Sequence, residues 1–417
     1  MSSLTLIGAH RAVSELLENR PESWDVVRFK GLFERLDRRN VDLAHEMLSL
    51  RSTGEVVARA EMGGRQEPDE ASLPKYLVAE IDDLVVNPMW LIGGGIGVSL
   101  RAGAVSPDYR VFRSRGALLP RFVHHLLRSQ PYLDQYLLYT RAQTTFDRRV
   151  QQSDLDNLPL PVPPLDEQRA IANYLDRETA RIDMLIDEQQ RLIEMLRERR
   201  WSVVERSVAL LDWNTPLKAV AVLIQTGPFG SQLKSDEYED GGTPIINPSH
   251  IVAGEVVPDP RIAVGAAKAA QLARHALEEG DLVAARRGEL GRCAVVGAPA
   301  VGFLCGTGSA LVRFNRAFIE PAFGAIVFSS RRNRDALALA SVGSTMDNLN
   351  SDIIGSLHIP VPTLEEQRGL VAEISSATAK IDTLIDESER FIELSRERRS
   401  AVITAAVTGQ IDVREVA

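Results

Sequence analysis

Two stretches of the chain carry apolar residues at helical spacing on a charged background. The apolar positions recur at steps of three, four and seven, the pattern of a coiled-coil seam. The sequence therefore predicts two long helices of about 40 residues, each roughly 60 Å long at ~1.5 Å per residue. The predicted seam consists of Ile171, Leu175, Ile182, Leu185, Leu192, Leu196 and Val203 in the first helix, and of Leu370, Ile374, Ile381, Leu384, Phe391 and Val402 in the second.

The ends of both predicted helices are marked in the sequence. Each follows a proline-rich segment, which a helix interior would not accept. Thr363 and Glu366 have the spacing of a capping box at the start of the second helix. Pro164 stands at the matching place in the first helix, which must be capped differently. Gly409 is expected to close the second helix at its C′ position.

The two helical tracts are copies of one another. Residues 161–169 (PVPPLDEQR) recur at 360–368 (PVPTLEEQR), an offset of 199. Between 158–200 and 357–399, 23 of 43 positions are identical without a gap, which indicates an internal duplication. If the helices pair antiparallel, a pseudo-twofold axis places the preceding domains at opposite ends of a rod. The alternative is that each helix packs only on its own domain.

A region of mixed character precedes each copy. Residues 1–157 and 210–356 both contain short β-like runs broken by Gly, Pro, Asn and Asp, and then a more helical stretch. Both end on a similar phrase, at 144–147 (TTFD) and 344–347 (STMD), whereas their middles barely resemble each other. Two copies of one plan with divergent middles suggest one job done on two different targets.

These patterns together predict an α+β fold. It consists of two mixed α/β domains separated by two long antiparallel coiled-coil helices, related by a pseudo-twofold internal repeat. The predicted segments are 1–157 for the first domain, 158–209 for the first helix, 210–356 for the second domain, and 357–417 for the second helix and tail.

Composition narrows the class of protein. The 417 residues are 44% hydrophobic and 25% charged, which allows two to three globular domains. The net charge of −9 argues at first against a nucleic-acid binder, but the repeats 158–209 and 351–417 carry −2 and −5 of it. The nearly neutral domains can still present a basic face. The cysteines, Cys293 and Cys305, form neither a disulfide framework nor a zinc pair, and the seven histidines have no metal-ligand spacing.

The chain resembles the specificity subunits of type I restriction–modification systems. The resemblance rests on the two openings at 161–169 and 360–368, the A-[RK]-I-D-x-L-I-D-E cores, the R-E-R-R endings and the closing AVTGQID at 406–412. Segments of both domains are similar to target-recognition domains of that family, and the resemblance covers essentially the full length. These segments are 83–89 (DLVVNPM), 105–112 (VSPDYRVF), 227–231 (GPFGS) and 280–283 (GDLV).

The resemblance implies a division of labour. Each recognition domain would read one half of a bipartite, asymmetric site on double-stranded DNA, and the helices would set the spacer between the halves. The helices would also dock two modification subunits, which carry the S-adenosylmethionine chemistry, so this chain would hold no cofactor of its own. Restriction and translocase subunits can then join. We expect a cytoplasmic protein, because the sequence has neither a membrane-spanning run nor a secretory signal.

We expect no active site. Residues 87–90 (NPMW) resemble the N-P-P-[YFW] loop of amino-methyltransferases, but Met89 replaces the second proline and no strand–G-x-G–helix unit precedes them. Residues 306–309 (GTGS) lack the lysine of a phosphate-binding loop. Two alternatives are weaker. A methyltransferase fused to its own recognition domains needs a cofactor motif, and a scaffold unconnected with DNA leaves the resemblance unexplained.

Side chains that can read bases are Arg, Lys, Asn and Gln, although most basic residues only contact the backbone of DNA. The sequence offers candidates for DNA contact in both domains. They are Arg59, Arg65, Arg101, Tyr109 and Arg110 in the first domain, and Gln232, Lys234, Arg286, Arg287 and Arg292 in the second.

Overall fold

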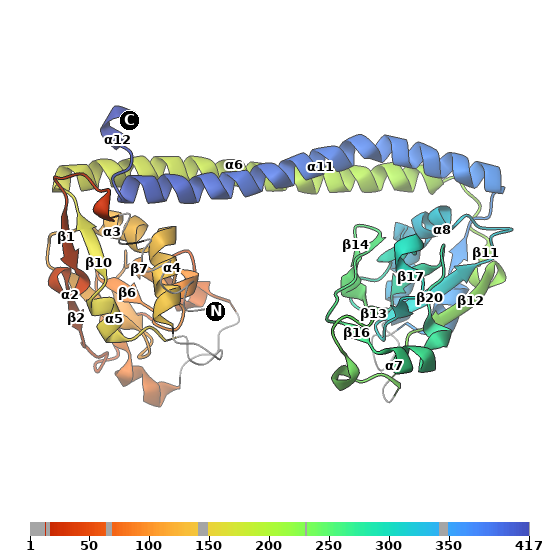
Figure 1. Ribbon diagram of the computed structural model, residues 1–417, viewed down its shortest axis with the longest axis horizontal. Coiled ribbons are helices and arrows are strands. Elements are labelled where there is room, and N and C mark those ends of the chain that lie inside the picture. Colours follow the sequence, from red (N-terminus) through yellow and green to blue (C-terminus); the bar gives the residue numbers. More distant parts are fainter. Residues whose placement is uncertain are drawn as a thin grey trace. The chain divides into compact units, whose positions relative to one another are not determined.

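A computed structural model describes residues 13, 17–63, 69–140, 149–229, 232–341 and 349–416. The chain forms two compact units (Figure 1). The first unit contains residues 1–190 and 389–417, and the second contains residues 191–388. Each long helix therefore contributes one half to each unit. The four segments named from the sequence do not coincide with these units, and their boundaries stay a prediction.

The two predicted long helices are present and pair antiparallel. They are α6 (Leu165–Val208) and α11 (Leu364–Val407), each of 44 residues. In the first unit, Arg399 Nε donates to Asp183 Oδ1 at 2.8 Å; in the second, Arg200 Nε donates to Asp382 Oδ1 at 2.6 Å. The two ion pairs join residues that correspond in the repeat. The antiparallel coiled coil is confirmed, and helices packed only on their own domains are excluded.

The buried seam has a different register from the predicted one. Buried residues recur at an interval of 11, as Ile171, Ile182, Ile193 and Val204 do on α6 and Ile381, Ile392 and Ile403 do on α11. The predicted seam residues Ile171, Leu175, Ile182, Leu196, Ile374 and Ile381 are buried. The residues Leu185, Leu192, Val203, Leu370 and Val402 are half-buried, whereas Leu384 and Phe391 are exposed, so the assignment of these last two to the seam was wrong. An interval of 11 residues (3.67 per turn) follows one face of an α-helix along its length, whereas a heptad (3.5 per turn) drifts off it.

The helix ends agree with their sequence signals. Glu366 N donates to Thr363 Oγ1 at 3.3 Å and Thr363 N donates to Glu366 Oε2 at 2.8 Å, which completes the capping box. Gly409 adopts the left-handed conformation (φ 74°) after the last turn of α11, as predicted. In the first copy, Glu167 matches Glu366 but instead accepts from the Trp24 indole N–H at 2.7 Å.

The first domain is built on a four-stranded antiparallel sheet with the order β2-β9-β6-β7. The strand pairs β3–β4 and β5–β8 form two separate sheets, and the pair β1–β10 directly precedes α6. The strands are β1 (Asp25–Arg28), β2 (Phe33–Leu36), β3 (Leu48–Leu50), β4 (Val56–Ala58), β5 (Leu77–Ala79), β6 (Leu84–Val86), β7 (Ile96–Val98), β8 (Gly103–Val105), β9 (Arg110–Ser114) and β10 (Pro159–Val162). The helices are α2 (Phe29–Leu32), α3 (Pro120–Leu127), α4 (Gln130–Tyr139), α5 (Gln152–Asp156) and, at the C-terminal end, α12 (Val413–Val416).

The second domain repeats this plan. Its four-stranded antiparallel sheet has the order β12-β20-β17-β18, and β11–β21 corresponds to β1–β10. The outer strands differ, forming a β16-β13-β19 sheet and a β14–β15 hairpin. The strands are β11 (Thr215–Pro216), β12 (Ala221–Thr226), β13 (Thr243–Ile246), β14 (Ile251–Val252), β15 (Glu255–Val256), β16 (Ala263–Val264), β17 (Leu282–Ala285), β18 (Cys293–Val295), β19 (Leu304–Cys305), β20 (Ser309–Phe314) and β21 (His358–Ile359). The helices are α7 (Ala266–Gln271), α8 (Pro321–Phe328), α9 (Arg331–Ser341) and α10 (Ser351–Ser356).

A buried glutamine fastens each domain to its long helix. Gln168 Oε1 accepts from Leu119 N at 2.7 Å, and its Nε2 donates to Ala117 O at 2.9 Å. Gln367 does the same with Glu320 N at 2.8 Å and Phe318 O at 2.7 Å. Neither glutamine is exposed to solvent. The glutamine of the repeated E-Q-R motif is therefore a structural clamp, and the fold has the predicted class, with two α/β domains of one plan on an antiparallel helix pair.

Candidate nucleic-acid interface

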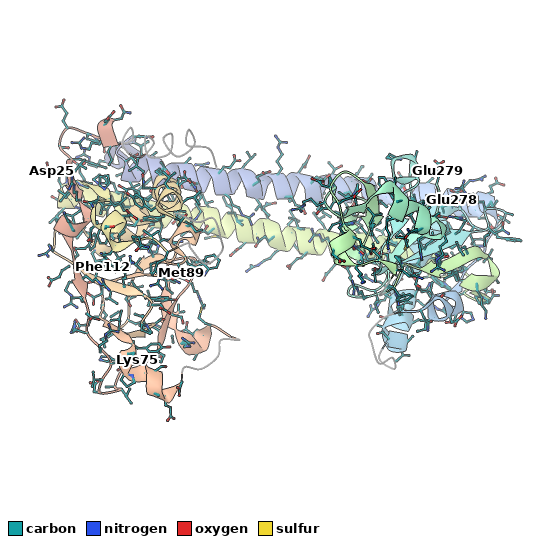
Figure 2. All side chains as sticks on the ribbon, turned by 60° about the horizontal axis from the view of Figure 1, so that its bottom comes forward. Asp25, Lys75, Met89, Phe112, Glu278 and Glu279 are labelled. Carbon is teal, nitrogen blue, oxygen red and sulfur yellow. The ribbon has the colours of Figure 1, made fainter. Side chains whose placement is uncertain are left out.

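A buried aspartate holds the start of the central strand in each domain. Asp83 Oδ1 accepts from Arg113 Nε at 2.9 Å, and Asp281 Oδ1 accepts from Arg313 Nε at 2.8 Å. Both aspartate side chains are only 1% exposed. The hydrogen bond to the carboxylate of Asp281 raises the pKa of Arg313. Glu278, labelled in Figure 2, also contacts Arg313.

The residue before each aspartate lies in a left-handed turn. Asp82 has φ 69° and Gly280 has φ 82°. The turn orients the backbone N–H of Glu80 and of Glu278 toward the aspartate that follows. Glycine adopts this conformation without strain, which accounts for the glycine of the GDLV segment. The strand before each loop, β6 or β17, is therefore held by the same kind of buried Asp–Arg pair.

The loops after β6 and β17 occupy corresponding positions. Val150 N donates to Pro88 O, and Leu349 N donates to Arg286 O, both at 3.0 Å. Val150 and Leu349 are 199 residues apart, the offset of the repeat. Pro88 and Arg286 are therefore equivalent by their backbone contacts, although the side chains that follow them differ.

Two predicted base readers are buried and bind the backbone. Arg110 Nη2 donates to Val150 O at 3.0 Å, and Arg286 Nε donates to Leu349 O at 2.8 Å. Burial lowers the pKa of both guanidinium groups. Tyr109, beside Arg110, is also buried. Arg110 and Arg286 therefore have a structural role, whereas contact of any of the three residues with DNA stays a prediction.

The remaining predicted readers lie at or near the surface. Arg101 pairs with Glu61 at 2.9 Å, and Arg292 Nε donates to Glu289 Oε2 at 3.0 Å. Gln232 Oε1 accepts from Arg274 at 3.1 Å. Lys234 and Arg287 are exposed and Arg59 is half-buried, while Arg65 falls outside the described residues, as do both TTFD-like phrases. The structure brings Arg286 and Arg287 together at the end of β17.

Sequence reasoning missed two exposed aromatic side chains, one in the loop after β6 and one in the segment after β12. Trp90 follows Pro88 and is 60% exposed. Phe229 is 53% exposed, and the Arg286 guanidinium lies 4.6 Å from the centre of its ring. Both stood inside segments that the sequence had singled out, NPMW and GPFGS. Their exposure depends on the turns that carry them, which the sequence pattern does not specify.

The first unit also contains a cavity of about 720 Å³ between α3 and the two long helices. Its lining includes His124, His125, Arg128, Asp176 and Arg399. Burial, and then the cations of Arg128 and Arg399, lower the pKa of His124 to about 4. In the second unit, the matching positions of α8 are Ala325 and Ile326. The polar cavity is thus tied to residues that the second domain does not share.

Other chemistry finds little support in the described residues. Within the described ranges, no three His, Cys, Asp or Glu side chains are placed to hold one metal ion. Burial raises the pKa of the thiols of Cys293 and Cys305 to about 12. Among the described helices, none is both long and apolar enough to cross a membrane.

Comparisons with known proteins point to one family. The family model described as a type I restriction modification DNA specificity domain matches residues 224–390. The type I restriction enzyme MjaVIII specificity subunit of Methanocaldococcus jannaschii is 20% identical, over 68% of this chain and 69% of its own length. The EcoKI specificity subunit of Escherichia coli K12 is 22% identical, over 72% of this chain and 68% of its own length.

A solved structure shares the fold. It comes from work on complex assembly and conformational transition of the type I R-M system, and it matches with a TM-score of 0.69 at 18% identity. The match covers 94% of this chain and 100% of that chain. At this identity the likeness concerns the fold alone.

Proposed function

We propose that the chain is a type I restriction–modification specificity subunit whose two domains each read one half of a bipartite, asymmetric DNA site. The observation that carries the proposal is that the two domains share one scaffold but differ in the loops at its strand ends. Both domains have the same four-stranded sheet and the same buried Asp–Arg pair. The loop after β6 nevertheless reads NPMW, whereas the loop after β17 reads RRGE. Equal scaffolds with unequal surfaces suit two different targets.

A domain exchange tests this proposal. Residues 210–356 are replaced with the second domain of another specificity subunit, and the variant is co-expressed with modification subunits. Single-molecule sequencing of the methylated genome then reports the site. One half of the methylated site should change and the other should persist. A change in both halves would contradict the proposal that each domain recognises its own half of the site.

The helices, on this proposal, set the spacer and dock two modification subunits. Two observations support it: α6 and α11 pair through a seam of buried residues at intervals of 11, and the repeated tracts carry most of the net negative charge. Inserting two such repeats, 22 residues, after Gln190 and after Ser388 keeps the seam in register. The insertion lengthens the pair by about 33 Å, close to the ~34 Å of one DNA turn.

The expected result is a spacer longer by about 10 base pairs. The same insertion in α6 alone disrupts the pairing and serves as the control. Methylome sequencing of both variants measures the spacer. An unchanged spacer in the double insertion would exclude the helices as its determinant.

The chain itself is proposed to be non-catalytic, with S-adenosylmethionine bound by the modification subunits. The NPMW segment supports this, because its backbone is folded into a tight turn and Met89 takes the place of the second proline. The purified chain alone should transfer no labelled methyl group to DNA. Transfer by the chain alone would revive the methyltransferase alternative.

A further inference from the structure

Trp90 is mounted on a rigid turn at the end of β6. Its backbone N–H donates to Asn87 O at 3.1 Å, and its backbone carbonyl accepts from Gly93 N at 3.0 Å and Gly95 N at 2.9 Å. Asn87 Oδ1 also accepts from the backbone N–H of Met89 at 3.1 Å. Met89, labelled in Figure 2, lies in the same turn. The backbone of Trp90 is therefore fixed, although its indole remains largely in water.

The glycines of this turn make room for the tryptophan. A Cβ at Gly93 would lie 2.9 Å from the indole ring, and one at Gly95 would lie 2.8 Å from Trp90 O. The Cε3–Cζ3 edge of the ring thus lies against Gly93, while the residue is 60% exposed. A large aromatic ring that is held in place yet exposed is typical of a recognition residue, because little conformational entropy is lost when a partner covers it.

Phe229 has the same character in the second unit. Its ring lies 4.6 Å from the guanidinium of Arg286, which is itself fixed by its bond to Leu349 O at 2.8 Å. Gly227 N donates to Ser309 O at 3.0 Å, and a side chain at Gly227 would clash with the carbonyl of Gly306. The chain leading to Phe229 is therefore held close to the sheet, while the ring is 53% exposed.

The two rings lie near the ends of corresponding strands, β6 and β17, although Phe229 comes from the segment after β12. Trp90 is two residues beyond Pro88, and Phe229 packs on Arg286, the residue equivalent to Pro88. An exposed arginine accompanies each ring, Arg149 next to Val150 and Arg287 next to Arg286. Phe229 contacts the guanidinium of Arg286, and both domains have an exposed arginine beside the segment at their strand end. Such a surface fits a DNA duplex better than an apolar protein surface, since the arginines can bind phosphates while the ring meets the bases.

We propose that Trp90 and Phe229 are specificity-determining residues, each contacting the bases of its own half-site with its ring. This inference rests on the proposed function, because it requires both domains to bind DNA. An aromatic ring can pack on a thymine methyl group or enter a base step, and both contacts depend on sequence. The NPMW segment then serves in recognition rather than in catalysis.

The test uses the full chain co-expressed with a modification subunit of the same system. Trp90→Ala and Phe229→Ala are compared with Leu100→Ala and Phe318→Ala, which remove side chains that are 77% and 50% exposed in the same two domains. The probe is a duplex oligonucleotide carrying the site found by methylome sequencing of the wild-type complex. W90A and F229A should each weaken binding to this duplex about tenfold or more. Each should relax the methylated sequence in one half-site only, and a different half for each variant.

The outcomes separate this inference from the proposed function. If the wild-type complex methylates a bipartite site and both variants bind it as well as their controls, the inference fails and the proposed function stands. If the wild-type complex recognises no DNA sequence, both fail. If W90A unfolds at a lower temperature than the wild type, the affinity of Trp90→Phe for the duplex is measured instead. Retained affinity supports a role for the ring, and a loss as large as that of W90A contradicts it.

Discussion

The first and second domains share the residues that hold the frame. Each has an aspartate in front of its central strand, Asp83 or Asp281, bound by an arginine from the neighbouring strand. Each is fastened to its long helix by a buried glutamine, Gln168 or Gln367. These contacts are polar and buried, and each depends on one particular side-chain geometry. Such contacts tolerate little change, since an unpaired partner would remain in the interior.

The domains differ where side chains face outward. The loop after β6 carries an exposed tryptophan, whereas the loop after β17 carries the exposed Arg287 beside the buried Arg286. Helix α3 places His124 and His125 on a polar cavity, whereas α8 has alanine and isoleucine at those positions. The comparison shows that duplication followed by divergence kept the buried polar clamps and changed the surfaces around them.

The largest expected effect is the loss of the clamp at the central strand. Arg313→Met leaves the carboxylate of Asp281 buried without its partner, so the free energy of unfolding should fall by about 2 kcal/mol or more. Arg113→Met should cost somewhat less, because Arg113 is 43% exposed and Arg313 only 24%. Urea unfolding measures both. Arg38→Met, which breaks the exposed pair with Glu80, is the control and should cost less than about 1 kcal/mol.

The second prediction concerns the glutamines of the repeat. Gln168→Leu and Gln367→Leu each leave backbone groups of the domain unpaired in the interior, at a cost of about 1–3 kcal/mol. Thermal unfolding of the full chain measures the change, and Gln190→Leu, at an exposed position of α6, is the control. Equal losses would confirm that the two clamps are equivalent. A loss in only one variant would contradict that equivalence.

Local signals in the sequence predicted the parts of the fold that depend on neighbouring residues. The T-x-x-E pattern at Thr363 and the glycine at position 409 fix backbone groups only a few residues away, and both predictions are confirmed. Predicting the buried seam of the long helices requires the repeat length of the apolar positions over several turns. A heptad and an 11-residue repeat share Ile182, but only the 11-residue repeat includes the buried Ile193.

The candidate interface was harder to predict, because burial there depends on distant segments. Arg110 and Arg286 look like free cations in the sequence. Each is buried by the segment that enters at Val150 or Leu349, 40 and 63 residues further along the chain. Trp90 is the opposite case, because an aromatic residue is ordinarily expected in the core and this one is exposed. Only the hydrogen-bonded turn from Asn87 to Gly95 keeps it at the surface.

The third prediction uses His124, one of the two histidines that only the first domain has at its cavity. The pKa of His124 is about 4 in the folded chain and about 6.5 when unfolded. Its neutral form therefore contributes stability above pH 6.5, and this contribution is lost as the pH falls toward 4. Hydrogen exchange at α3, corrected for intrinsic rates, should accelerate between pH 7 and pH 5, and α8 should change less. His124→Gln should reduce the acceleration at α3, whereas His358→Gln, at an exposed position, should not.

The smallest effect is expected at the helix starts, where the two copies use one glutamate differently. Thr363→Ala removes the capping box of α11 and should cost about 1 kcal/mol, measured by thermal unfolding. Glu167 binds Trp24 and Arg414 in place of a cap, so Glu167→Gln should loosen the segment around Trp24 rather than the first turn of α6. Hydrogen exchange can separate the two sites. Faster exchange at the first turn of α6 in the Glu167 variant would show that this glutamate caps its helix after all, and the contrast between the copies would disappear.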